Sequence, residues 1–381
     1  MNLFSSNTID REKCSVTDSE DLEIIYSVKD FPVKMGCTDR PQELDLKAEM
    51  LWAISKKSGL IQLKKLIPLD LLYSEQHGPG TVGKTWKLHH QEFAKFLIKH
   101  AFGNVLEIGG AHGILYVESQ KIKELNWTIL EPNPDPIKGC NARFIRGFFD
   151  EKFCSDRKYN SYVHSHVLEH LYNPREFMEI LQRNAQVGDK QIFSIPNLYK
   201  QLKKFYTNAI MFEHTIFLTE PYIEYLLNQN NFEIIEKQYF MDDHSIFFAT
   251  EKKNHVKTKP LSKDLYFENI LIFNEYINYL KKSINDINNK IKNKKNIYLF
   301  GGHVFSQTLI SYGLKTNFIK NILDNDPKKF NKRLYGTNLF VKSPQVLKDE
   351  VNPIVILRAG AYTNEIKKDI IENINRSTVF I

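Results

Sequence analysis

The sequence predicts an α/β fold built around a mostly parallel sheet, and two observations support this. From about residue 86 to residue 252, strand-like apolar runs alternate with helix-like runs, as they do where helices connect parallel strands. Twice a strand-like run leads directly into glycines, at VLEIGG (105–110) and at YLFGG (298–302). We therefore expect two α/β units, a larger central one and a smaller C-terminal one.

The elements of the central unit follow from their apolar spacing. Residues 86–101 predict an amphipathic helix, because Phe93, Phe96 and Leu97 recur at three to four residues. A second helix is expected over PREFMEILQRNAQ (174–186). Strands are expected at 105–108, 127–132, 142–149, 161–167 and 191–197, with a closing hairpin near 232–252.

Changes in pattern divide the chain into four segments. Residues 1–85 mix short β-like runs with turn-rich pieces, which suggests a small N-terminal domain. Residues 86–252 form the central unit, and 253–295 hold a polar linker and one long amphipathic helix. Residues 296–381 form the smaller α/β domain.

Composition narrows the class of protein. The 381 residues are 42% hydrophobic and 25% charged, which excludes disorder and disulfide-rich scaffolds. The net charge of +7 is spread along the chain, so we expect no nucleic-acid partner. Four scattered cysteines, no signal-like N-terminus and no long apolar run lead us to expect a cytoplasmic protein without membrane contact.

The glycine turn at Val105–Gly113 is the main functional signal. Glu107 precedes Gly109, Gly110 and Gly113 in the order E-x-G-x-x-x-G. Glycines allow a ligand to lie on the backbone, and the following helix offers free N–H groups. A dinucleotide fingerprint would need glycine at 111 and 114, where Ala111 and Ile114 stand. A tight turn with no ligand is the alternative.

Three later features add to this signal. Glu131 ends the next strand-like run and is suited to accept hydrogen bonds from ribose hydroxyls. GFFDEKF (147–153) brings Phe149 and Asp150, which could flank an adenine ring and bind its amine, although a core role for the phenylalanines is equally open. Ser165 and His166 open SHVLEHL (165–171) at the end of the fourth strand.

In this order the four features resemble the class I S-adenosylmethionine (SAM)-dependent methyltransferases. The resemblance implies a Rossmann-like, mostly parallel seven-stranded sheet and SAM as cofactor. It also implies a set of cofactor-binding residues: Glu107, Gly109, Gly110, Gly113, Glu131, Phe149, Asp150, Ser165 and His166.

The flanking segments are similar to those of the three-domain sugar methyltransferases of bacterial nucleotide-sugar and surface-polysaccharide pathways. The similarity lies in SGLIQL (58–63), TW-x-x-HH (85–90), MFEHTIFLT (211–219) and the C-terminal glycine turn. It implies methyl transfer to a nucleotide-linked sugar by a monomer or homodimer. It also implies that residues 1–85 form a substrate-side domain and that the C-terminal domain is Rossmann-like.

The same resemblance assigns catalytic and substrate roles. His214 is expected to be the base, with Glu213 orienting it or binding the sugar. Tyr73 and His77 are expected to contact the acceptor. The second glycine turn, Gly301 and Gly302 with Asp324 on the next strand, could hold the phosphate end of an activated sugar or be purely structural.

One departure from the sugar family concerns its zinc site. The family holds zinc with paired cysteines, but here only Cys14 remains, with Thr17, Ser55 and Ser58 at the partner positions. One thiolate cannot make a tetrahedral structural site. We therefore predict no metal and an N-terminal domain held by packing alone.

Other functions compete with this prediction. His166-x-x-Glu169-His170 also fits the H-x-x-E-H pattern of a zinc metallopeptidase, provided that it lies in a helix. A SAM-dependent enzyme could instead act on RNA, protein or another small metabolite. A non-enzymatic nucleotide-binding module is the remaining alternative.

Overall fold

The computed structural model describes residues 8–72, 83–155 and 157–381. Tyr73 and His77 lie outside the described residues. Within the described part of the chain, no helix is long and apolar enough to cross a bilayer.

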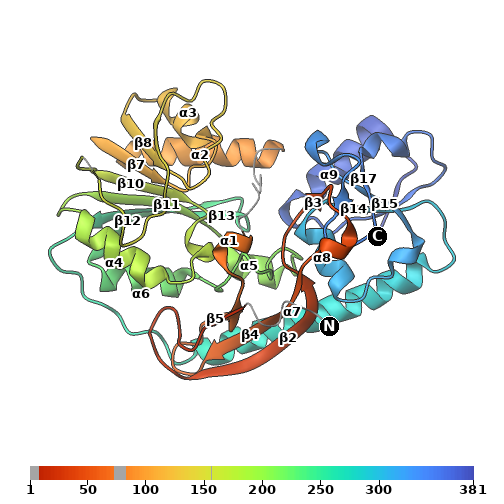
Figure 1. The fold of residues 1–381 in the computed structure, drawn as a ribbon, viewed down its shortest axis with the longest axis horizontal. Helices are drawn as coiled ribbons and strands as arrows, with labels where there is room; N and C mark the ends of the chain where they lie inside the picture. Colours follow the sequence, from red (N-terminus) through yellow and green to blue (C-terminus); the bar gives the residue numbers. More distant parts are fainter. Residues whose placement is uncertain (1–7, 73–82, 156) are drawn as a thin grey trace.

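A seven-stranded sheet forms the larger α/β part, on the left in Figure 1. Its order is β12-β13-β11-β10-β7-β8-β9. The strands are β7 (Asn104–Ile108), β8 (Asn126–Leu130), β9 (Arg143–Ile145), β10 (Ser161–Ser165), β11 (Lys190–Pro196), β12 (Phe232–Phe240) and β13 (Ser245–Lys252). The strands from β7 to β11 pair in parallel, and β13 is antiparallel to both β11 and β12. The predicted mostly parallel sheet and its closing hairpin are confirmed.

The third strand is shorter than the predicted 142–149. It ends at Ile145, and the chain turns at Gly147 so that Phe149 packs inward against Phe153 and Phe177. A continuous apolar run cannot distinguish an edge strand from a loop that turns into the core.

Helices cover both faces of this sheet because alternate strand residues point to opposite sides. On one face, Leu106, Tyr162 and Phe193 pack with α4 (Pro174–Asn184) and α6 (Glu220–Gln229). On the other, Val105 and Val163 pack with α2 (Lys84–His100) and α3 (Ile114–Gln120). The short helix α5 (Leu198–Lys203) follows β11.

A second, all-parallel sheet lies in the C-terminal part, with the order β17-β15-β14-β18-β19. The strands are β14 (Ile297–Phe300), β15 (Ile319–Leu323), β17 (Val341–Lys342), β18 (Ile354–Ile356) and β19 (Val379–Phe380). Helix α8 (Val304–Ser311) follows the second glycine turn, and α9 (Thr363–Asp369) follows β18. This sheet agrees with the predicted C-terminal α/β architecture.

The N-terminal part is a small antiparallel sheet that contacts both neighbours. Its strands β2 (Leu22–Pro32), β4 (Lys47–Ser55) and β5 (Ile61–Leu63) pair in that order, and β1 (Ile9–Asp10) pairs with β6 (Lys65–Leu66) ahead of helix α1 (Leu69–Leu72). Strand β3 (Cys37–Thr38) pairs with β16 (Arg333–Leu334) of the C-terminal part. Near it, Arg333 forms a buried two-bond ion pair with Asp45, with N–O distances of 2.5 and 2.9 Å.

The long helix α7 (Leu265–Ile291) confirms the predicted amphipathic helix and runs beneath the N-terminal strands (Figure 1). Its first half buries Phe273 and Tyr276 against the N-terminal sheet. Its second half buries Ile284 and Ile287 against the C-terminal sheet. One helix therefore holds both parts in a fixed arrangement.

The positions of the missing zinc cysteines gather in a hydrogen-bonded cluster. Cys14 Sγ lies 3.3 Å from Ser58 Oγ, and the Ser58 N–H donates to Ser55 Oγ at 3.2 Å. Ser55 in turn donates to Asp21 at 2.9 Å. The expectation that packing alone holds this domain is corrected, because side-chain hydrogen bonds also join these turns.

Candidate active site

The central sheet has a topological switch point between β7 and β10. From β7 the chain continues to β8 on one side, whereas β10 lies on the other, and ligands of such sheets bind at the carboxyl ends of the strands there. Gly109 follows β7 with a φ of +74°, and a Cβ on it would come within 2.9 Å of Val167 Cγ2. The glycine turn and the segment after β10 are therefore in direct contact.

The glycine turn is packed tightly from behind. A Cβ on Gly110 would lie 2.7 Å from the Glu107 carboxyl carbon, and one on Gly113 would lie 2.3 Å from Cys140 Sγ. Gly113, with a φ of +68°, precedes the first turn of α3. Glycine is therefore needed at these positions.

Glu107 faces the core under this turn. Its carboxyl group accepts a hydrogen bond from Trp127 Nε1 at 2.8 Å, and burial raises the pKa of Glu107 to about 8. The structure therefore places Glu107 behind the turn, where it supports the backbone.

Glu131 lies at the rim of the turn. One carboxylate oxygen accepts the N–H of Ala111 at 3.1 Å, and the other accepts the N–H of Asn133 at 3.0 Å. Two backbone donors thus fix a carboxylate whose remaining lone pairs can accept ribose hydroxyls.

The segment predicted to contact adenine, GFFDEKF (147–153), holds two adjacent phenylalanines that differ in exposure. Phe149 is 9% exposed and belongs to the core, whereas Phe148 is 54% exposed. Asp150 accepts the N–H of Lys152 at 2.9 Å in the following turn. Phe148 is therefore the aromatic ring of this pair that is available to a ligand.

Ser165 ends β10, and His166 leaves the sheet in a left-handed conformation with a φ of +54°. This conformation is costly for a residue with a side chain and persists only where neighbours enforce it. His166 Nε2 lies 3.0 Å from Ser245 Oγ, and its Nδ1 lies 3.4 Å from Glu169 Oε1.

Three titratable side chains lie close together in space beside His166. Glu169 and His170 belong to the short 3-10 helix Leu168–His170, and His214 precedes α6. One nitrogen or oxygen of each lies within 4.8 Å of the others, and Glu169 is only 1% exposed. We call Glu169, His170 and His214 the acid–base cluster.

His214 presents a free lone pair. Its ring donates to the backbone carbonyl of Ala209, and its Nδ1 is buried without a partner among the described residues. The donor is therefore Nε2, and Nδ1 is the basic nitrogen. Burial, with the charge of His170, lowers the pKa of His214 to about 3, so the ring is neutral at pH 7.

Glu169 is the carboxylate that the structure brings beside His214. Burial opposes its ionisation, but the hydrogen bond from His166 and the charge of His170 outweigh this and lower the pKa of Glu169 to about 2. Glu213 is also buried, and burial raises its pKa to about 7. The backbone carbonyl of Glu213 accepts a hydrogen bond from the ring of His170, so this residue helps to place the cluster.

Comparisons with known proteins agree with this geometry. Residues 84–237 match the family model described as a methyltransferase domain. Residues 256–381 match the model described as a C-methyltransferase C-terminal domain. The chain is a methyltransferase. Its cofactor is S-adenosylmethionine, which the switch-point turn and Glu131 fit.

Solved structures similar to this methyltransferase cover less than half of the chain. Magnesium protoporphyrin IX methyltransferase (ChlM) from Synechocystis PCC 6803 is 15% identical, with 46% of this chain and 90% of that chain covered and a TM-score of 0.36. The PH0226 protein from Pyrococcus horikoshii OT3 is 13% identical, with coverages of 45% and 92% and a TM-score of 0.38. No curated protein sequence matches the chain significantly.

Sequence reasoning did not assign Glu169 and His170 to the methyltransferase site. Both residues belong to the SHVLEHL run of the methyltransferase resemblance, but a role was considered for them only in H-x-x-E-H. That motif needs a helix, whereas His166 has a left-handed conformation and Glu169 and His170 lie in a single 3-10 turn. The adjacent Glu-His pair four residues after a parallel strand was the available signal, since that edge of the sheet carries the site.

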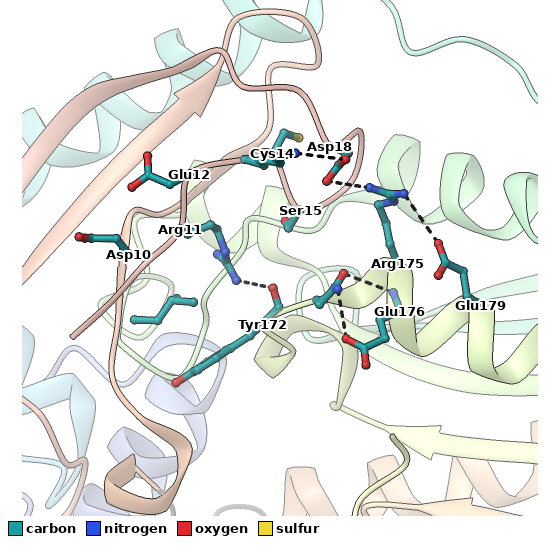
Figure 2. Close-up of a pocket in the computed structure, with 13 residues that line it drawn as sticks. Asp10, Arg11, Glu12, Cys14, Ser15, Asp18, Tyr172, Arg175, Glu176 and Glu179 are labelled. Atoms are coloured by element: carbon teal, nitrogen blue, oxygen red, sulfur yellow. Dashed lines mark hydrogen bonds and ion pairs between the residues drawn. The ribbon is translucent and has the colours of Figure 1, made fainter. Parts of the chain in front are cut away.

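A groove of about 490 Å³ opens between the N-terminal segment and the start of α4 (Figure 2). Within it, Arg11 donates to the carbonyls of Tyr172 at 2.8 Å and Thr215 at 3.0 Å. Arg11 thereby ties the N-terminal segment to the residue that follows His214.

The charges of this groove do not suit a phosphate. Figure 2 shows Arg175 between Asp18 and Glu179, at N–O distances of 3.1 and 3.7 Å. The other carboxylates that line it come from Asp10, Glu12 and Glu176. With its arginines engaged and carboxylates in excess, the groove is a poor place for the anionic end of a nucleotide sugar.

The second glycine turn is filled by a carboxylate. Asp324 accepts the N–H of Gly302 at 2.8 Å and the ammonium group of Lys329 at 3.0 Å. The backbone donor that a phosphate would use already has an anionic partner, which favours the structural role for this turn.

Proposed function

We propose that this methyltransferase transfers the SAM methyl group to a carbon atom next to the carbonyl of a nucleotide-linked sugar. The match of residues 256–381 to a C-methyltransferase C-terminal domain supports carbon as the acceptor atom. The acid–base cluster supports proton abstraction. The resemblance of the flanking segments to sugar methyltransferases supports the sugar, for a surface polysaccharide or a glycosylated metabolite.

SAM would be held by the glycine turn, Glu131 and the segment from Ser165 to His166. Bound there, it supplies an electrophilic methyl group whose bond to sulfur breaks as the acceptor attacks, with the electron pair passing to sulfur. The cofactor supplies only the methyl group. Side chains of the protein must therefore position the acceptor and remove its proton.

His214 is proposed to remove that proton. Its Nδ1 lone pair accepts the proton from the carbon next to the carbonyl, and the electrons of the C–H bond form the enolate that attacks the methyl group. The ring becomes a buried imidazolium, which would be costly without an anion. Glu169, within 4.8 Å and ionised, is the anion that the structure provides.

Each segment of the chain has its own role in this proposal. Residues 86–252 bind SAM, residues 1–85 close the acceptor side, and residues 253–295 and 296–381 support the site from the other side. Phe148, Tyr73 and His77 are proposed as contacts to adenine or acceptor. The protein is proposed to act in a bacterial cytoplasm as a monomer or homodimer.

The test uses methyl-¹³C SAM with a panel of nucleoside-diphosphate sugars, each with and without a keto group. The expected result is a new ¹³C methyl signal bonded to carbon, only with keto sugars. A methyl group on oxygen or nitrogen, or transfer only to RNA, protein or a non-sugar metabolite, would contradict the proposal.

Deuterium exchange gives a second readout that does not need methyl transfer. With S-adenosylhomocysteine in place of SAM, the enzyme should exchange the hydrogen next to the carbonyl of the correct sugar in D₂O. The His214→Asn variant should lose this exchange and still bind the cofactor product. Exchange at the wild-type rate in this variant would exclude His214 as the base.

A further inference from the structure

The segment that follows β18 in the C-terminal part touches the methyltransferase site directly. Tyr362 lies in the 3-10 helix Gly360–Tyr362, and Glu365 lies in α9. The two side chains reach the start of α2 and the hairpin between β12 and β13, both of which border the carboxyl edge of the central sheet.

Glu365 supplies the cap of α2. Its carboxylate accepts the Lys84 N–H at 3.2 Å and the Thr85 hydroxyl at 2.9 Å. Gly83, at the N-cap position, has no side chain to do this. A helix N-terminus favours an anionic acceptor, so the C-terminal part completes a helix of the SAM-binding part.

Tyr362 begins a chain of hydrogen bonds that ends at His166, which contacts the acid–base cluster. Its hydroxyl lies 3.2 Å from His244 Nε2, and His244 Nδ1 lies 2.7 Å from Ser245 Oγ. Ser245 Oγ lies 3.0 Å from His166 Nε2. His166 Nδ1 then faces Glu169 at 3.4 Å.

The charged and donor-only groups beside this hydrogen-bond chain set its direction. The Glu169 carboxylate lies 3.4 Å from His166 Nδ1 and attracts the ring proton to that nitrogen, so that Nε2 accepts. The Ser245 hydroxyl must therefore donate to His166 and accept from His244 Nδ1. That leaves His244 Nε2 as an acceptor for the Tyr362 hydroxyl.

The Tyr362 end of this hydrogen-bond chain gives the same direction of donation. The indole of Trp86 hydrogen-bonds to Tyr362, and an indole N–H can only donate. The Tyr362 oxygen thus accepts from Trp86 while its hydrogen goes to His244. A donor-only group and an acceptor-only group specify the same arrangement, and hydrogen bonds aligned in one direction strengthen one another.

We infer that Tyr362 is a positioning residue of the methyltransferase, which acts through His244, Ser245 and His166 to hold the backbone after β10 and to orient Glu169 toward His214. The inference rests on the proposed SAM and base sites. It explains how His166 is kept in a left-handed conformation, because both of its ring nitrogens are engaged. It also makes the C-terminal part a component of the active site.

A metal site is the competing interpretation of the same imidazoles. One nitrogen each of His89, His166 and His244 lies within 4.8 Å of the others. However, both nitrogens of His166 and of His244 already have partners in the chain described above. A metal ion bound by these imidazoles would have to break the hydrogen bonds from Tyr362 to His166.

The test compares the wild-type enzyme, Tyr362→Phe and the matched control Tyr298→Phe, using ¹⁵N-histidine NMR. Tyr298 is a buried tyrosine of β14 in the C-terminal sheet, and its hydroxyl donates to Glu350 at 2.7 Å. In the wild type, His166 and His244 should both carry the proton on Nδ1. In Tyr362→Phe, His244 should become a mixture of tautomers, whereas Tyr298→Phe should leave both rings unchanged.

Kinetics with the acceptor found above supply the second readout. Tyr362→Phe should lower kcat about 10-fold and change the KM for SAM less than about twofold. An unchanged His244 tautomer, an equal loss in Tyr298→Phe, or metal-type shifts of His166 and His244 on adding Zn²⁺ alone would each overturn the inference. Calorimetric SAM binding by the wild type reports separately on the proposed cofactor site.

Discussion

The carboxylate of Glu131 accepts the backbone N–H of Ala111 at 3.1 Å, which fixes an acidic group from the end of β8 against the glycine turn that follows β7. The contact joins two adjacent parallel strands at their carboxyl ends. It makes the rim of the turn rigid and negatively charged, as recognition of ribose hydroxyls requires.

Replacing Glu131 with alanine should weaken SAM binding by about 1–3 kcal/mol, roughly the contribution of hydrogen bonds to a charged group. Isothermal titration calorimetry measures this directly. Glu124→Ala, an exposed glutamate before the same strand, is the matched control and should bind SAM normally. Equal affinities for the two variants would place the ribose elsewhere.

Gly109→Val should abolish SAM binding. A side chain there meets Val167 Cγ2 at 2.9 Å and requires a φ of +74°, which β-branched residues strongly disfavour. Circular dichroism would verify that the variant is folded. Gly139→Val is the control, because Gly139 has a φ of +91° but no atom within 4 Å of its Cβ position. Normal SAM affinity in a folded Gly109→Val protein would contradict the site.

His214→Asn should leave SAM affinity within about twofold and lower turnover by about 10²–10⁴, the usual contribution of a general base. Glu169→Gln should lower turnover without removing it, since the imidazolium loses its anion but the base remains. Glu179→Gln, an exposed glutamate of α4, is the control. Turnover that survives in His214→Asn but vanishes in Glu169→Gln would reverse the two roles.

Local pattern was enough to predict the central sheet. The alternation of apolar runs and the glycines after Ile108 identify parallel strands, and the resemblance adds the strand number. Patterns do not report contacts between distant segments. Glu169 meets His214, and His244 meets Tyr362, across 45 and 118 residues of chain. Only the folded topology brings these side chains together. The resemblance could therefore indicate His214, but the pairing of His214 with Glu169 and the link to Tyr362 could not be predicted.

Burial also decides properties that residue type leaves open. Glu107 and Glu131 are both acidic residues at strand ends, but the first is buried behind the turn and the second lies at its rim. Phe148 and Phe149 are identical residues with opposite exposure because the chain turns at Gly147. From the sequence alone, the two glutamates could not be distinguished by burial, nor could the two phenylalanines.

Buried histidines should make the folded protein sensitive to acid. Burial lowers the pKa values of His164, His214 and His244 to about 3, against about 6.5 in an unfolded chain. Below pH 6.5 the unfolded state therefore binds more protons at these sites than the folded state. Their contribution to stability is complete above pH 6.5 and is lost as the pH falls toward 3.

Two buried carboxylates act in the opposite direction. Burial raises the pKa of Glu107 to about 8 and that of Glu213 to about 7, so the folded state holds these protons where an unfolded glutamate, with a pKa near 4.3, has lost them. Their contribution is complete below about pH 4.3 and is lost as the pH rises toward 8. The free energy of unfolding should therefore be highest near pH 6.5. It should fall more steeply below pH 4.5, where the opposing glutamate effect has ended and Glu169, with its pKa lowered to about 2, also loses its contribution.

Urea unfolding at several pH values measures this profile, and one substitution isolates the histidine effect. His164 stacks on Phe193 with ring centroids 4.8 Å apart, so His164→Phe keeps a planar ring there without a titratable group. Each lost proton corresponds to about 1.4 kcal/mol per pH unit, and the variant should be less sensitive to acid by that amount between pH 6 and 4. The exposed His255→Phe variant should keep the wild-type slope. Parallel profiles for the wild type and His164→Phe would show that His164 is already charged in the folded protein.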